Sequence, residues 1–115
     1  GNGGPTAAPA YPAALPDVIA VTAVDANRRI YRYANQGAYV RLAARGVGIS
    51  AAAPGGRSAT YSGTSFATPL VAVRLSRCLG TNGGTVRGCI SALEREAIDL
   101  GSPGPDPIYG HGLIE

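Results

Sequence analysis

Apolar positions follow a strand-like pattern in the first half of the chain. Residues Val18 to Val24 form a nearly continuous β-branched run, and Tyr39 to Ala43 form a second short apolar run. Runs of this length predict strands buried on both faces, as in a parallel sheet. Gly46 to Ala53 and Arg57 to Tyr61 flank a Pro-Gly-Gly turn, which predicts a hairpin. The alternation of Arg28 to Ala34 predicts an exposed strand or hairpin arm.

A helical period replaces this pattern after residue 63. Apolar residues between Thr64 and Leu79 recur at helical spacing and nearly surround the first half of the segment. This pattern predicts a helix in the protein interior, ended by Gly80. Thr85 is placed to N-cap a second helix, whose apolar residues recur at spacings of three and four until Gly101. The second helix is therefore expected on the surface.

These elements predict an α/β fold that this chain does not complete. Two buried strands, one buried helix and one surface helix are fewer elements than a whole parallel-sheet domain needs. The first seventeen residues contain repeated prolines, which exclude a helix there and predict a loop. No apolar stretch is long enough to cross a bilayer, so we expect no membrane segment in this chain.

Composition and charge narrow the classes of function. The 115 residues are 45% hydrophobic and 15% charged, which is typical of a folded chain and not of a disordered one. The net charge is +3, and the ten basic residues are all arginines spread from Arg28 to Arg95 without forming a run. Nucleic-acid-binding domains gather basic residues on one face, so we expect no nucleic-acid partner.

The segment Tyr61 to Pro69 carries the strongest chemical signal. It places Ser65 in the first turn of the predicted buried helix. Unpaired backbone N–H groups and the positive end of the helix dipole meet at that point, so an oxyanion formed beside the Ser65 hydroxyl would be stabilised. By residue type alone, Thr64 or Ser65 would equally serve as a helix cap, because both types are preferred there.

The sequence Gly63-Thr64-Ser65-Phe66-Ala67-Thr68-Pro69 resembles the nucleophile motif of the subtilase family of serine proteases (peptidase family S8). Other segments resemble subtilase segments in the family's order: Gly1-Asn2, Tyr11-Pro12-Ala13, Val18 to Val21, Gly46-Val47 and Tyr109 to Leu113. The resemblance covers nearly the whole chain. It implies that residues 1–115 are the C-terminal half of a subtilase catalytic domain, part of a three-layer fold with a mostly parallel sheet and a buried nucleophile helix after a hairpin.

The resemblance also implies a function. The complete protein would be a serine endopeptidase, with a peptide or protein as its substrate. Ser65 would be the nucleophile, and the side-chain amide of Asn2 would donate to the oxyanion. The residues expected to contact the substrate are Gly1, Gly63 and Thr64.

The other catalytic residues are not found in this chain. In subtilases the Asp and the His precede the Ser, yet no His precedes Ser65 here. Asp17 and Asp25 precede it, but neither lies in the family's Asp-Thr-Gly or Asp-Ser-Gly context. We therefore expect the catalytic Asp and His to lie upstream of Gly1, and we expect this chain alone to be inactive. The missing N-terminal half of the domain, or a swapped copy in its place, is the expected partner.

Two other functions remain open. The first is a non-catalytic pseudoprotease or binding module that kept the Ser half of the domain. The second is an esterase of the α/β-hydrolase type, because Ser65, an Asp and His111 follow that family's chain order, with Asp99 or Asp106 as the Asp. That fold expects Gly-x-Ser-x-Gly, and here Ala67 stands at the last position.

The resemblance carries four further expectations. Subtilases are mostly exported, which favours a disulfide between Cys78 and Cys89 over two separate buried thiols. It also indicates a secreted or periplasmic protein whose signal lies outside this chain. The Tyr11–Pro12 peptide bond is expected to be cis. No cofactor is required, but some subtilases bind Ca²⁺ or Na⁺ weakly through backbone carbonyls, which here belong to Ala13, Leu15 and Val18.

Overall fold

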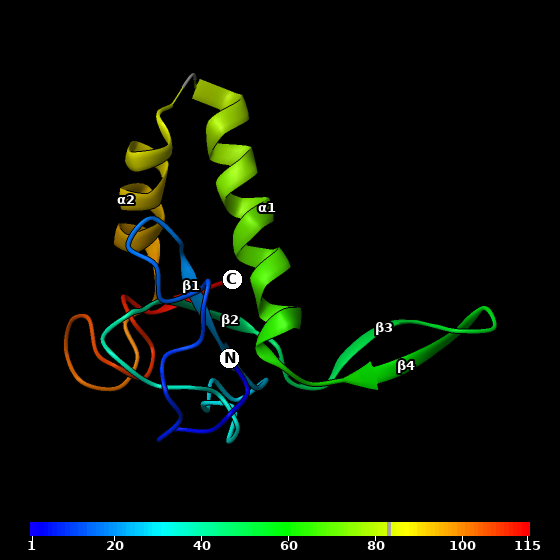
Figure 1. Cartoon of the computed structure of the whole chain (residues 1–115). Coiled ribbons are helices and arrows are strands. Elements are labelled where there is room, and N and C mark those ends of the chain that lie inside the picture. The colour runs from blue at the N-terminus through cyan, green and yellow to red at the C-terminus, as the bar shows by residue number, and fades with distance from the viewer. Residues whose placement is uncertain (83) are drawn as a thin grey trace.

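The computed structural model describes residues 1–82 and 84–115. Its elements, in chain order, are β1 (Ala20–Val24), β2 (Val40–Arg45), β3 (Ile49–Ala53), β4 (Arg57–Tyr61), α1 (Thr64–Asn82), α2 (Val86–Glu96) and β5 (Leu113–Ile114). The two helices lie side by side over the sheet, and the β3–β4 hairpin extends away from them (Figure 1). The fold is therefore mixed α/β, as the sequence predicts.

A parallel sheet with the strand order β1-β2-β5 forms the centre of the structure. One face carries the side chains of Ala23, Leu42 and Ala44, which pack with Ala67 and Val71 of α1. The opposite face carries a second cluster, formed by Val24, Ala43 and Leu113, with Leu100 and Tyr109 packed against it. Both faces are buried, which explains why the strands read as continuous apolar runs.

The predicted hairpin is present, and β3 pairs with β4 in antiparallel register from Ile49–Tyr61 to Ala53–Arg57. The predicted exposed strand over residues 28–34 is not. Only an isolated bridge between Val24 and Ile30 forms there, and Arg28 adopts a φ of 62°. A residue with positive φ turns the chain and interrupts an extended strand. Strand β5 was not predicted, because a two-residue strand leaves no periodic signal.

Both helices end at residues other than those predicted. Helix α1 continues past Gly80 to Asn82, and the Thr81 hydroxyl donates to the Arg77 carbonyl within its last turn. Helix α2 is capped by Thr85, whose side chain accepts from the Gly88 N–H, but it ends at Glu96 and not at Gly101. The chain leaves the helix early because Ile98 exchanges two backbone hydrogen bonds with Leu113 of β5.

The surroundings of α1 also differ from the prediction of a helix buried all round. Ala67 and Val71 face the sheet and are buried, whereas Leu70 is 44% exposed and Val73 is 50% exposed. The described residues cover only one side of this apolar helix. A disulfide joins Cys78, near the end of α1, to Cys89 in the first turns of α2. The Tyr11–Pro12 bond is cis, as expected.

The end of β2 and the start of α1 approach closely at Gly46. A Cβ added to Gly46 would lie 2.6 Å from the Gly63 carbonyl oxygen, 2.8 Å from the Ala23 Cβ and 3.1 Å from the Ala67 Cβ. The Gly46 carbonyl also accepts a hydrogen bond of 2.8 Å from the Gly63 N–H. The absence of a side chain at residue 46 therefore allows the turn before Ser65 to lie directly on the sheet.

We predict that Gly46→Ala lowers the free energy of unfolding by about 1–3 kcal/mol, because the added methyl group meets backbone and forces the turn outward. The matched control is Gly80→Ala, whose new methyl group meets no atom within 4 Å. Ala loses less backbone entropy than Gly when a helix forms. The Gly80→Ala control should therefore raise the free energy of unfolding by about 0.5–1 kcal/mol. Urea denaturation of both variants measures the difference. Equal effects of the two substitutions would contradict the packing argument.

Candidate active site

Ser65 lies in the first turn of α1, at the tightly packed junction described above. The Gly63 carbonyl accepts from the Phe66 N–H at 3.1 Å, which closes the turn around Thr64 and Ser65. Thr64 is buried with 6% of its surface exposed, whereas Ser65 is exposed. Within residues 1–82 and 84–115, the Ser65 N–H and hydroxyl form no hydrogen bond. An exposed hydroxyl and an unpaired N–H therefore share the positive end of a 19-residue helix.

Asn2 comes from the other end of the chain and contacts this same turn. Its side-chain oxygen accepts from the Thr64 N–H at 3.0 Å and from the Thr64 hydroxyl at 3.1 Å. The side-chain nitrogen Nδ2 lies 3.5 Å from the point that a Cβ on Gly63 would occupy. In the described part of the chain, Nδ2 donates to no protein atom. The oxygen of the amide is thus engaged, and its N–H₂ group is left as a donor.

The aromatic rings of Tyr61 and Phe66 stack on each other. Their centroids are 5.3 Å apart and their planes are inclined by 13°. Tyr61 ends β4 and Phe66 belongs to the first turn of α1, so the stack links the hairpin to the helix. Rings in contact at this distance stabilise by about 0.5–1.5 kcal/mol beyond the area that they bury.

The segment that carries Asn2 is held by Asn35, a residue that the sequence analysis did not single out. Asn35 is buried, with 6% of its surface exposed. Its side-chain oxygen accepts from the Gly3 N–H at 2.7 Å, and its side-chain nitrogen donates to the Ala8 carbonyl at 3.1 Å. In the sequence, Asn35 begins the segment Asn35-Gln36-Gly37, whose residue types are typical of a turn. Its contacts span about thirty residues of chain, so no local signal predicts them.

The Gly1 nitrogen belongs to the same cluster. It donates to the Thr64 hydroxyl oxygen at 3.2 Å. Gly1, Asn2, Gly63, Thr64 and Ser65, all named from the sequence, are therefore gathered in one place.

The residues of the alternative hydrolase arrangement are engaged elsewhere. His111 Nε2 lies 3.5 Å from Glu94 Oε1. The Asp106 carboxylate accepts from three backbone N–H groups, those of Ser102, Ile108 and Tyr109. Asp99 accepts from the Gly104 N–H at 2.8 Å. No hydrogen bond joins any of these side chains to Ser65 in the described residues, so the structure offers no observation in favour of that arrangement.

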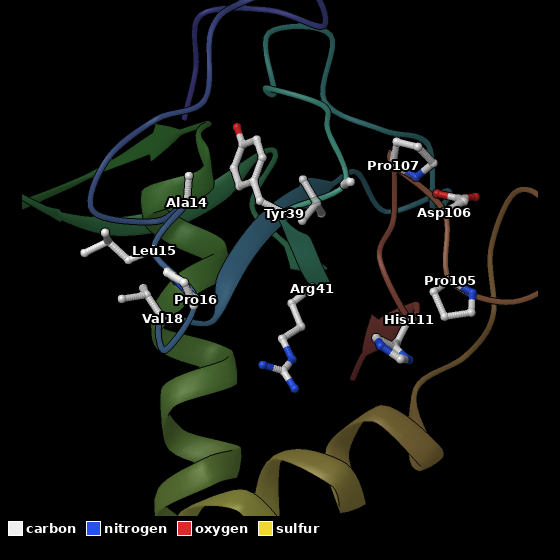
Figure 2. Close-up of a pocket in the computed structure, with 12 residues that line it drawn as sticks. Ala14, Leu15, Pro16, Val18, Tyr39, Arg41, Pro105, Asp106, Pro107 and His111 are labelled. Atoms are coloured by element: carbon white, nitrogen blue, oxygen red, sulfur yellow. The ribbon is translucent and has the colours of Figure 1, made fainter.

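A cavity of about 440 Å³ lies beside the loop expected to supply cation-binding carbonyls. Leu15 and Val18 line it, and so does Arg41, whose guanidinium points into the space between this loop and His111 (Figure 2). Arg41 Nε pairs with Glu94 Oε1 at 2.5 Å. The Leu15 carbonyl already accepts from the Val18 N–H at 3.1 Å.

The described residues contain neither a cluster of metal-ligating side chains nor a helix that could span a membrane. No group of three or more His, Cys, Asp or Glu side chains is arranged to hold a metal ion. Neither described helix combines the length and apolar character that a membrane span requires.

Comparison with known proteins places the chain in a family. The family model described as "Subtilase family" matches residues 1–112. Over 115 residues the chain is 36% identical to "Subtilisin" of Bacillus pumilus and 35% identical to "Subtilisin E" of Bacillus subtilis strain 168. These matches cover 99% of this chain but only 41% and 29% of the two relatives, so the chain spans less than half of their length.

A solved structure supports the fold independently. The chain resembles the "Crystal Structure of a Lanthipeptide Protease" with a TM-score of 0.78 and 24% identity, over 90% of this chain and 40% of that one. At this level of identity the match establishes the fold alone. Together with the match of the family model along nearly the whole sequence, it leads to one conclusion: the chain belongs to the subtilase family of serine proteases.

Proposed function

We propose that this chain supplies the nucleophile and the oxyanion-binding groups of a serine endopeptidase. One observation carries the proposal: the exposed Ser65 hydroxyl shares the first turn of α1 with its own unpaired N–H, and the free Asn2 amide lies against the same turn. Two N–H donors beside a nucleophilic oxygen are what a tetrahedral oxyanion requires.

In the proposed reaction, Ser65 Oγ forms a bond to the carbonyl carbon of the scissile peptide while its proton passes to a general base. The carbonyl oxygen becomes an oxyanion that accepts from the Ser65 N–H and from Asn2 Nδ2. The C–N bond then breaks, and the base returns the proton to the leaving amine. Water releases the acyl group from Ser65 by the same sequence of steps. Gly1, Gly63 and Thr64 line the position of the substrate in this proposal.

The general base and its orienting carboxylate have to come from outside this chain. The only His is His111, which lies beside Glu94 and forms no hydrogen bond with Ser65 in the described residues. The relatives are more than twice as long as the matched stretch. We therefore propose that a preceding part of the same domain supplies the His and the Asp. The named relatives include a "Minor extracellular protease Epr", matched over 100% of this chain, and an "Intracellular serine protease", matched over 57%. Because disulfides persist mainly in oxidising compartments and Cys78 is bonded to Cys89, we also propose that the complete protein is exported.

The surface of the chain indicates where the preceding part would bind. Strand β1 is an edge of the sheet, so one side of its backbone has no strand partner in the described residues. Beside it runs a groove of about 340 Å³, lined mainly by apolar side chains that include Ile19, Val21 and Leu75. An unpaired edge next to apolar surface favours association with another strand-bearing segment. We propose that the N-terminal part of the domain occupies this groove.

We predict that Ser65→Ala in the complete protein lowers kcat by about 10⁶-fold, the loss that subtilisin shows when its nucleophile is removed. Asn2→Ala should lower kcat by about 100- to 1000-fold, which is the cost of one oxyanion donor in subtilisin. Cleavage of a chromogenic peptide and labelling by a fluorophosphonate probe measure both effects. Thr60→Ala, an exposed change on β4, is the control. Peptidase activity that survives Ser65→Ala would contradict the proposal, and a pseudoprotease would show neither activity nor labelling.

We predict that the purified chain of residues 1–115 does not cleave peptides and does not remain a stable monomer, because its β1 edge and the exposed Leu70 and Val73 lack a cover in the described residues. Size-exclusion chromatography with mass spectrometry should show association beyond the 11.6 kDa of one chain. The double variant Leu70→Lys/Val73→Lys should shift the population toward monomer. Ser58→Lys/Thr60→Lys, which adds the same charge to the exposed hairpin, should not. A monodisperse monomer with a cooperative melt would contradict this prediction.

We also propose that the loop from Ala13 to Val18 needs no bound cation, because its own backbone hydrogen bonds, from Ala14 to Ala10, from Leu15 to Pro12 and from Val18 to Leu15, already hold its turns. The melting temperature of the folded protein should then be the same in chelator, in excess calcium chloride, and in sodium or choline chloride at equal ionic strength. A native-state site filled to 100 times its Kd would add about 2.7 kcal/mol of stability and would be easily seen. A rise that is specific to calcium or sodium would overturn this proposal.

A further inference from the structure

Asn35 is the one buried side-chain amide among the described residues, and its contacts concentrate on the segment that carries Asn2. Its side-chain oxygen accepts from the N–H of Gly3 at 2.7 Å. Its own backbone N–H donates to the carbonyl of Gly1 at 2.9 Å. Asn35 therefore holds the residue before Asn2 and the residue after it.

The segment fits tightly against Asn35. A Cβ on Gly1 would lie 2.7 Å from both Cγ and Nδ2 of Asn35, and one on Gly3 would lie 3.3 Å from Oδ1. The Asn35 Nδ2 group donates to the Ala8 carbonyl at 3.1 Å, which ties the following part of the loop to the same side chain. One amide group thus fixes the loop at two points, because its oxygen accepts at one of them and its nitrogen donates at the other.

The side chain of Asn2 depends on this support. Thr64 holds the Asn2 side-chain oxygen, but neither of its contacts restrains the Asn2 backbone. Other hydrogen bonds hold the loop on either side: the Gly4 N–H donates to the Tyr33 carbonyl at 2.8 Å, the Asn35 backbone N–H to the Gly1 carbonyl at 2.9 Å, and the Gly1 nitrogen to the Thr64 hydroxyl at 3.2 Å. In the described residues, only the Asn35 side chain engages the Gly3 N–H. Without the Asn35 side chain, the Gly3 N–H and the Ala8 carbonyl would lose their partners and would turn toward water. Gly3 and Ala8 are exposed, so water would replace the lost partner of each group, and the loop would no longer be fixed in one position.

We propose that Asn35 is a positioning residue that sets the place of the Asn2 amide, and through it the stabilisation of the oxyanion. This inference rests on the proposed function. Asn35 does not touch the reacting atoms, and its effect passes through the loop from Gly1 to Gly3. A displacement of about 1 Å in a catalytic group costs up to about 100-fold in rate. The loss should fall on kcat, because the oxyanion forms only in the transition state.

A double-mutant cycle in the complete protein tests the proposal. Asn35→Ala should lower kcat by about 10- to 100-fold with little change in KM. In an Asn2→Ala background the same substitution should change kcat by less than about 3-fold, because the group that it positions is already gone. Fluorophosphonate titration counts the folded sites in each variant, so that kcat refers to competent enzyme only. If Asn35→Ala does not accumulate as folded protein, Asn35→Ser is carried through the same cycle.

Asn27→Ala is the matched control, because Asn27 is the same residue type and is exposed. It should leave kcat and KM unchanged. Equal losses from Asn35→Ala in the presence and absence of the Asn2 amide would overturn the proposal, as would a loss confined to KM. Failure of the proposed function is distinguishable, because it would appear as activity that does not depend on Ser65, whatever residue stands at position 35.

Discussion

The two hydrogen bonds that Thr64 donates to the Asn2 side chain hold the candidate site together. They join the first loop of the chain to the first turn of α1, which lie 62 residues apart in sequence. They also settle the orientation of the amide, because an oxygen that accepts twice leaves the nitrogen as a donor. Asn2 therefore caps the helix with one end of its side chain and presents an N–H₂ group with the other. The one side chain of Asn2 therefore caps the start of α1 and also presents the N–H₂ group that is proposed to bind the oxyanion.

The sequence predicts those parts of the fold that depend on local pattern. Continuous apolar runs in β1 and β2 follow from burial on both faces, and Thr85 caps α2 as its residue type indicates. The errors occur where distant contacts override local preference. Helix α2 ends early because Ile98 pairs with Leu113, and α1 passes through Gly80 although Gly is a common helix terminator.

The residues of the candidate site also fall into two groups, those that the sequence predicts and those that only the fold brings together. Ser65 and Asn2 are recognisable because they lie in short motifs of fixed residue types. Asn35 and Arg41 are not recognisable from sequence. Asn35 stands in a segment that is typical of a turn, and its partners are Gly3 and Ala8. Arg41 lies within a buried strand, and only the fold brings Glu94 and the loop of Leu15 to its side chain. Their roles depend on long-range pairing, for which the local sequence carries no signal.

The disulfide between Cys78 and Cys89 has a consequence for a protein of this family that is separate from folding. A protease is exposed to its own activity, and a polar segment between two helices is an ordinary target for self-cleavage. Any single cut between residues 78 and 89 leaves the two pieces covalently joined through sulfur. Helix α2 then cannot diffuse away from α1, the helix whose first turn carries Ser65. The disulfide would keep the two fragments in one molecule after cleavage in this segment, so such a cleavage need not inactivate the protein.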